Sequence, residues 1–191
     1  MDVNLDRVET FENPAEFCDW LAQNHVQAPE IWLKIYKKAS KIASIDWEQA
    51  VIEAIAWGWI DGIKKSCDTL SYYQRFTPRR ARSNWSQKNR DHAENLMAKG
   101  RMQTPGLAHV TAAKADGRWD AAYAGAATME IPADFLEALA ANPEAQSFYD
   151  TLNRSSIFVI YHSLLSAKRP QTRADRMAKL LDMLARGEKP R

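Results

Sequence analysis

The stretch of sequence from residue 59 to residue 77 reads WIDGIKKSCDTLSYYQRFT. Residues 59–65 and 70–77 are rich in β-branched and aromatic side chains, and the polar residues 66–69 lie between them. Two such runs on either side of a short polar segment are typical of adjacent strands joined by a turn. We therefore predict an antiparallel hairpin with Asp68 at its turn.

The chain before this hairpin shows the signals of a helix, a strand and a second helix. Asn13 can cap a helix over residues 14–24, because its side chain can accept hydrogen bonds from free backbone N–H groups. Residues 31–36 alternate as a half-buried strand does. Asp46 can cap a second helix that ends at Gly58. This order predicts an α+β fold with a small antiparallel sheet packed with helices.

The chain after Pro78 has a helical pattern as far as its C-terminal region. Residues 124–129 are rich in small side chains and are predicted to form a linker. Capping residues and apolar periodicity predict helices over residues 86–99, 104–117, 132–141, 143–152, 156–167 and 172–186, the last capped by Thr172 and Asp175. We predict an α+β domain over residues 1–127 and an all-helical C-terminal module over residues 128–191.

The composition is that of an ordinary globular protein, with 46% hydrophobic and 26% charged residues among 191. The net charge of +2 is too small to require nucleic acid or an anionic membrane as a partner. Cys18 and Cys67 form no Cys-x-x-Cys pattern, so we expect reduced thiols rather than a disulfide or a zinc cluster. Residues 1–12 lack the apolar segment of a signal peptide, and no stretch approaches the roughly 20 apolar residues of a membrane span. The predicted location is the cytoplasm.

A basic segment follows the hairpin and is the strongest candidate site. No Asp or Glu occurs in residues 69–90, which contain six cationic side chains: Arg75, Arg79, Arg80, Arg82, Lys88 and Arg90. The segment leads into a predicted helix N-terminus, where free N–H groups and a partial positive charge favour anions. Arg adds bidentate donors and Trp85 adds a stacking face, which together suit an anion or a nucleotide. The alternative is structural: Ser83 and Ser86 would cap, Trp85 would be a hydrophobic staple, and the arginines would be solvated.

The hairpin adds a second group of candidates. With Asp68 at the turn, Asp61 faces Arg75 and Ile63 faces Tyr73, so Trp59, Asp61, Tyr73 and Arg75 share one face. A carboxylate on a packed face needs a partner, and we favour Arg75 as a structural partner of Asp61. The alternative is that Asp61 is a polar anchor or a general base in a pocket.

The candidate ligand-binding residues are therefore Trp59, Asp61, Tyr73, Arg75, Arg79, Arg82, Trp85 and Ser86. The four histidines have no metal-ligand spacing, and no nucleophile elbow, P-loop or dinucleotide fingerprint occurs. We predict no metal and no cofactor, and the sequence leaves open whether the chain catalyses a reaction.

Several short motifs resemble those of the bacterial YdeI/OmpD-associated family, whose members are also labelled bacteriocin-protection proteins. The motifs are GWIDG at residues 58–62, RFTPR at 75–79, SNWS at 83–86, GRM at 100–102 and AKADGRW at 113–119. Residues 132–187 resemble the helical module of that family. The resemblance implies a link to envelope stress or to tolerance of antimicrobial peptides, and it implies no catalytic residues.

Three functions are consistent with the sequence. The first is a cytosolic protein that binds a small anionic or aromatic ligand and acts in stress tolerance. The second is a nucleic-acid-binding module that uses the loop at residues 75–90 and the C-terminal basic helix, against which the balanced net charge argues. The third is an adaptor whose C-terminal helices dock a protein partner.

Overall fold

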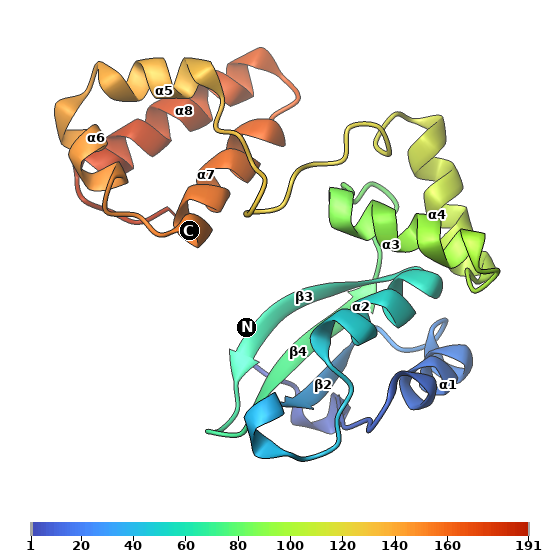
Figure 1. The fold of residues 1–191 in the computed structure, drawn as a ribbon. Coiled ribbons are helices and arrows are strands. Elements are labelled where there is room, and N and C mark those ends of the chain that lie inside the picture. Colours follow the sequence, from blue (N-terminus) through green and yellow to red (C-terminus); the bar gives the residue numbers. More distant parts are fainter. Residues whose placement is uncertain (1, 191) are drawn as a thin grey trace. The chain divides into compact units, whose positions relative to one another are not determined.

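The computed structural model describes residues 2–190, which divide into two compact units (Figure 1). The first unit contains the residues up to Trp85 together with Asn89–Ala121. The second contains Ser86–Lys88 together with the residues from Ala122 onward. The domain boundary between residues 127 and 128 stays a prediction.

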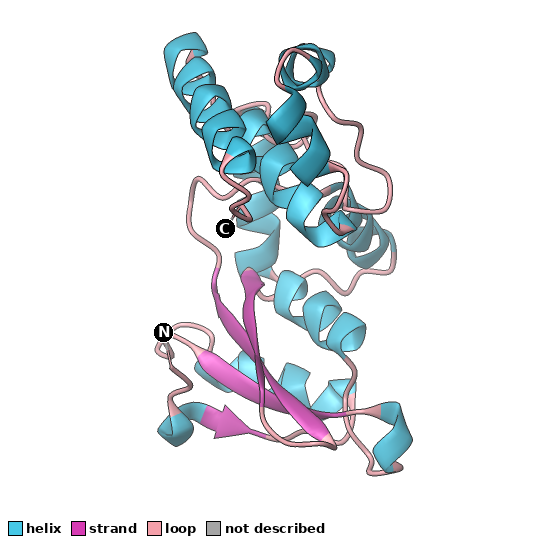
Figure 2. Ribbon diagram, turned by 90° about the vertical axis from the view of Figure 1, so that its left-hand side faces the viewer, coloured by secondary structure: helices cyan, strands magenta, loops and turns pink. Residues whose placement is uncertain are grey.

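The first unit is built on a four-stranded sheet with the order β1-β2-β4-β3. Figure 2 draws the strands of this sheet in magenta. The strands are β1 (Val8–Glu9), β2 (Ile31–Tyr36), β3 (Trp59–Ser66) and β4 (Ser71–Pro78). β3 and β4 form the predicted antiparallel hairpin, and β2 is the antiparallel neighbour of β4. The sheet as a whole is mixed, because the two-residue strand β1 pairs with β2 in parallel. These features confirm the α+β class.

Two helices cover one face of the sheet, and both begin at the predicted caps. In α1 (Pro14–Asn24) the Asn13 side chain accepts hydrogen bonds from the N–H groups of Ala15 and Glu16. In α2 (Trp47–Ala56) Asp46 and Gln49 form a complete capping box. The core between these helices and the sheet consists mainly of Phe17, Leu21, Ile31, Leu33, Ile35, Val51, Ile55, Trp59 and Phe76.

Two further helices, α3 (Gln87–Ala98) and α4 (Thr104–Ala115), follow the hairpin. The start of α4 lies against the C-terminal end of α2, where the Gln103 N–H donates to the Ala56 carbonyl. Gly106 makes this close approach possible. A Cβ atom at Gly106 would lie 2.3 Å from the Ala56 carbonyl oxygen and 2.6 Å from that of Ile55. The contact places His109, one turn further along α4, beside the end of α2 and the start of β3.

The second unit contains α5 (Ala133–Ala140), α6 (Pro143–Tyr149), α7 (Arg154–Leu165) and α8 (Pro170–Ala185). These helices surround a core made of Phe135, Leu139, Ala145, Leu152, Ile160, Leu164, Leu180 and Leu184. The all-helical C-terminal module is therefore confirmed. The predicted cap of the last helix is wrong: α8 begins at Pro170, because Pro suits a first helical turn, and Arg169 occupies the cap position without a side-chain hydrogen bond. The helices within residues 2–190 are all too short or too polar to span a lipid bilayer.

Candidate functional site

The register of the β3–β4 hairpin differs from the prediction. Asp61 faces Phe76 rather than Arg75, so the predicted cross-strand pair of Asp61 and Arg75 is wrong. Asp68 lies at the start of the turn, where its carboxylate accepts hydrogen bonds from Leu70 N, Ser71 N and the Ser71 hydroxyl at 2.8, 2.6 and 2.8 Å. The turn is therefore centred beyond Asp68. A β-bulge then places residues 62 and 63 opposite one residue of β4, which shifts the register again.

This register splits the four residues that were predicted to share a face. Asp61 lies on the face that carries Phe76 and packs against the helices, as does the buried Trp59. Side chains alternate between the two faces along a strand, so Tyr73 and Arg75 lie on the face opposite to Phe76. Their partners on β2 are Lys34 and Trp32. Arg75 forms its ion pair with Glu30, at 2.6 Å. Neither Tyr73 nor Arg75 therefore contributes to a site around Asp61.

The loop after β4 is held from inside by two buried arginines. Arg79 is 4% exposed, and its guanidinium donates to the Asn84 carbonyl at 3.0 Å. Arg118, from the segment after α4, is 8% exposed and donates to the Ser83 carbonyl at 2.8 Å. Two consecutive carbonyl groups of the loop thus each receive a charge-assisted hydrogen bond. We call these two arginines the arginine clamp.

Two indole rings pack beside the arginine clamp. The guanidinium carbon of Arg79 lies 3.9 Å from the centre of the Trp85 ring, within cation–π distance. Trp85 in turn meets Trp119 edge-on, with ring centres 5.0 Å apart. Both indoles are buried. The side-chain carboxylate of Asp116 accepts from the Arg118 guanidinium at 2.8 Å and partly neutralises it.

The clamp influences two titratable groups next to it. Burial raises the pKa of the Asp61 carboxyl, against the opposing effects of a hydrogen bond from Trp47 and of the Arg79 charge. Burial also lowers the pKa of His109, and the charges of Arg79 and Arg118 lower it further. His109 is therefore more strongly neutral at pH 7 than an exposed histidine. Arg79 and Arg118 thus supply positive charge near His109.

The structure brings together only some of the eight candidate residues. Arg79 and Trp85 are in contact, and Asp61 lies within electrostatic reach of Arg79.

The other candidates lie apart from this group. Trp59 belongs to the core, where its indole N–H donates to the His25 carbonyl at 3.3 Å. Arg82 is exposed on the loop, and Ser86 forms a β-bridge with Tyr123 in the second unit. The candidates Tyr73 and Arg75 are elsewhere, as described above.

Four further residues of this region were missed by the sequence reasoning: Trp47, His109, Arg118 and Trp119. Arg118 and Trp119 belong to the motif at residues 113–119, so the resemblance held a signal for them. Arg118 lies 35 residues after Ser83 in the chain, and no spacing rule connects the two. We find no sequence signal that marks His109 or Trp47.

Comparison with known families gives two matches. Residues 9–109, more than half of the chain, match the model of a domain of unknown function, DUF8412. The chain belongs to this family. Residues 128–187 match the model described as "Bacteriocin-protection, YdeI or OmpD-Associated", which confirms the resemblance found in the sequence. No curated protein and no solved structure matches the chain.

The first matched region contains most of the candidate site. It includes Asp61, Arg79, Trp85 and His109 and ends before Arg118. The second match begins at residue 128, so Arg118 of the arginine clamp lies in the segment between the two matched regions.

Proposed function

We propose that the first unit binds a small anionic ligand, with or without an aromatic ring, on the loop held by the arginine clamp. The observation that carries this proposal is that Arg79 and Arg118 bind consecutive loop carbonyls from inside, at Asn84 and Ser83. The neighbouring Arg80 and Arg82 are exposed. A loop that is already ordered loses less conformational entropy when its side chains bind a ligand.

The charge of the segment supports an anion as the ligand. Residues 69–90 contain no acidic side chain, and the positive charge near His109 agrees with that imbalance. Arg offers a planar fork of donors that matches a phosphate or a carboxylate. The exposed Arg80 and Arg82 therefore supply hydrogen-bond donors for the anion. A ligand group with two or more oxygens can accept two hydrogen bonds from one guanidinium.

The biological part of the proposal is tolerance of antimicrobial peptides, which the description of the second matched family supports. We also propose a cytoplasmic location. The free thiols Cys18 and Cys67 support it, because unpaired cysteines are usual in a reducing compartment.

A thermal-shift series with phosphate, sulfate, nucleotides and sugar phosphates tests the binding. An anion at a hundredfold excess over its dissociation constant should stabilise the wild type by about 2.7 kcal/mol. Arg82→Ala should weaken this stabilisation, because Arg82 lies on the loop, whereas Arg169→Ala should leave it unchanged, because Arg169 precedes α8 in the second unit.

Two results would count against the proposal. The loop would have only a structural role if no anion raised the melting temperature, or if Arg169→Ala weakened the effect as much as Arg82→Ala. Tight binding of a single-stranded oligonucleotide with a steep salt dependence would instead select the nucleic-acid alternative.

A further inference from the structure

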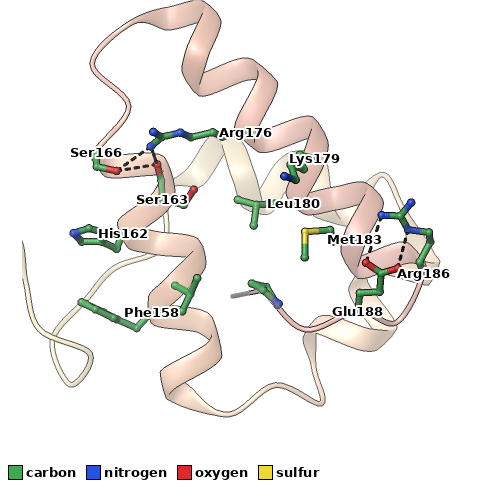
Figure 3. A pocket seen from close by; sticks show the side chains of 12 residues that line it. Phe158, His162, Ser163, Ser166, Arg176, Lys179, Leu180, Met183, Arg186 and Glu188 are labelled. Atoms are coloured by element: carbon green, nitrogen blue, oxygen red, sulfur yellow. Dashed lines mark hydrogen bonds and ion pairs between the residues drawn. The ribbon is translucent and has the colours of Figure 1, made fainter. Parts of the chain in front are cut away.

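The second unit contains a pocket that the proposed anion site does not use. The pocket has a volume of about 790 Å³ and lies between α7, α8 and the segment that follows α8 (Figure 3). A volume of this order is typical of sites for small molecules. All the residues that line it belong to the second unit, so its shape does not depend on the first.

The floor of the pocket is apolar. Leu180 and Met183 of α8 point into the space between α8 and α7, as Figure 3 shows. Val159 of α7 and Pro190 of the C-terminal segment also line it. Pro190 is buried, so this segment closes one side of the pocket. A closed side suits a short apolar chain better than a helix, which would need an open groove.

The rim of the pocket is positively charged. Arg176, Lys179 and Arg186 line it, and Glu188 is the only acidic side chain among the described residues that line it. Arg186 forms an ion pair with Glu188 at 3.3 Å, so the charges of these two largely cancel. The charges of Arg176 and Lys179 remain.

These two cations are placed differently. The Arg176 guanidinium is fixed at one nitrogen, which donates to the Ser163 carbonyl at 2.7 Å and to the Ser166 hydroxyl at 2.9 Å. Lys179 is exposed and forms no hydrogen bond or ion pair with any residue in the described part of the chain. One cation is thus held in place and the other can move to meet a ligand.

We propose that this pocket binds a small amphiphilic anion, in which an unbranched apolar chain carries one carboxylate or phosphate head group. The chain covers Val159, Leu180 and Met183, and burial of this apolar surface drives binding. The head group meets Arg176 and Lys179 at the rim. A neutral chain gains only the burial of apolar surface. A small anion without a chain gains only the contacts with Arg176 and Lys179.

Isothermal titration calorimetry of the whole chain tests this, with decanoate and decyl phosphate as the two anionic probes. Decanol and acetate are the matched controls for the chain alone and the head group alone. We expect at least one anionic probe to bind with a stoichiometry near one, and decanol and acetate to bind at least tenfold more weakly. The stronger of the two anions identifies the head group.

Three variants locate the binding. Lys179→Gln should weaken binding roughly tenfold, the equivalent of one charge-assisted contact, and Lys168→Gln should not change it. Lys168 is a matched control because it is exposed in the same unit and does not line the pocket. Met183→Trp should abolish binding by filling the pocket, and circular dichroism would confirm that this variant keeps its helices.

Three outcomes would overturn the proposal: neither anion binds, decanol binds as tightly as decanoate, or Lys179→Gln and folded Met183→Trp both bind as the wild type does. Arg82→Ala should bind decanoate normally. The pocket proposal and the loop proposal can therefore fail independently.

Discussion

Replacing Gly106 with alanine should destabilise the protein by about 3 kcal/mol, near the upper end for overpacking a well-packed interface. The added methyl group would lie 2.3 and 2.6 Å from the carbonyl oxygens of Ala56 and Ile55. These atoms are backbone atoms at the end of α2, so they cannot rotate away as a flexible side chain can. The methyl group therefore pushes α4 away from α2. Urea denaturation followed by circular dichroism measures the loss.

Gly125→Ala is the control for this prediction. A Cβ atom at Gly125 would meet no atom within 4 Å, and its backbone is outside the left-handed region. The control should therefore change stability by no more than about 0.5 kcal/mol. Equal stability of the Gly106→Ala and Gly125→Ala variants would show that α4 does not approach α2 this closely.

Replacing Arg79 with alanine should cost about 3 kcal/mol. The loss has two sources: a desolvated cation–π contact with Trp85, worth about 2 kcal/mol, and the Asn84 carbonyl, which would lose its buried donor at a cost of about 1 kcal/mol or more. Arg80→Ala is the matched control, because the neighbouring Arg80 is exposed and should contribute within about 0.5 kcal/mol.

Chemical denaturation of both variants tests whether Arg79 holds the loop as part of the arginine clamp or is solvated like Arg80. A solvated face predicts small and similar losses at Arg79 and Arg80. The clamp predicts a loss at Arg79 only, together with a change in Trp85 fluorescence, since the cation now stacked on that indole is removed.

The helices and strands of the first unit were largely predictable, because their signals are local. Asn13 and Asp46 act as caps through neighbouring backbone N–H groups, and the alternation at Ile31–Tyr36 is confirmed as β2. The strand β1 has only two residues, too short for any periodic pattern. The mixed character of the sheet was therefore not predictable.

The register of the hairpin and the partners of its charged residues were not predictable for a different reason. A bulge adds one residue to a strand without a distinctive sequence, so the side chains beyond it change their partners. Asp61 consequently faces Phe76, and Arg75 pairs with Glu30, which is 45 residues away in the chain.

The candidate site was only partly predictable. The acid-free composition of residues 69–90 identified the loop, but composition cannot separate the buried Arg79 from the exposed Arg82. That difference depends on Trp85 within the loop and on Trp119 and Arg118, which long-range packing brings to the loop.

The most direct test of the loop proposal is a titration with phosphate and then adenosine monophosphate, followed by ¹H–¹⁵N NMR. The Trp85 indole is buried within the loop against the Arg79 guanidinium, so its Nε1–H resonance should respond to changes in the loop. We predict saturable shifts of the backbone amides of residues 79–85 and of the Trp85 indole, with no shift at Arg169. Shifts confined to the second unit, or no saturable shift in residues 79–85 at millimolar ligand, would contradict the proposal that this loop binds an anion.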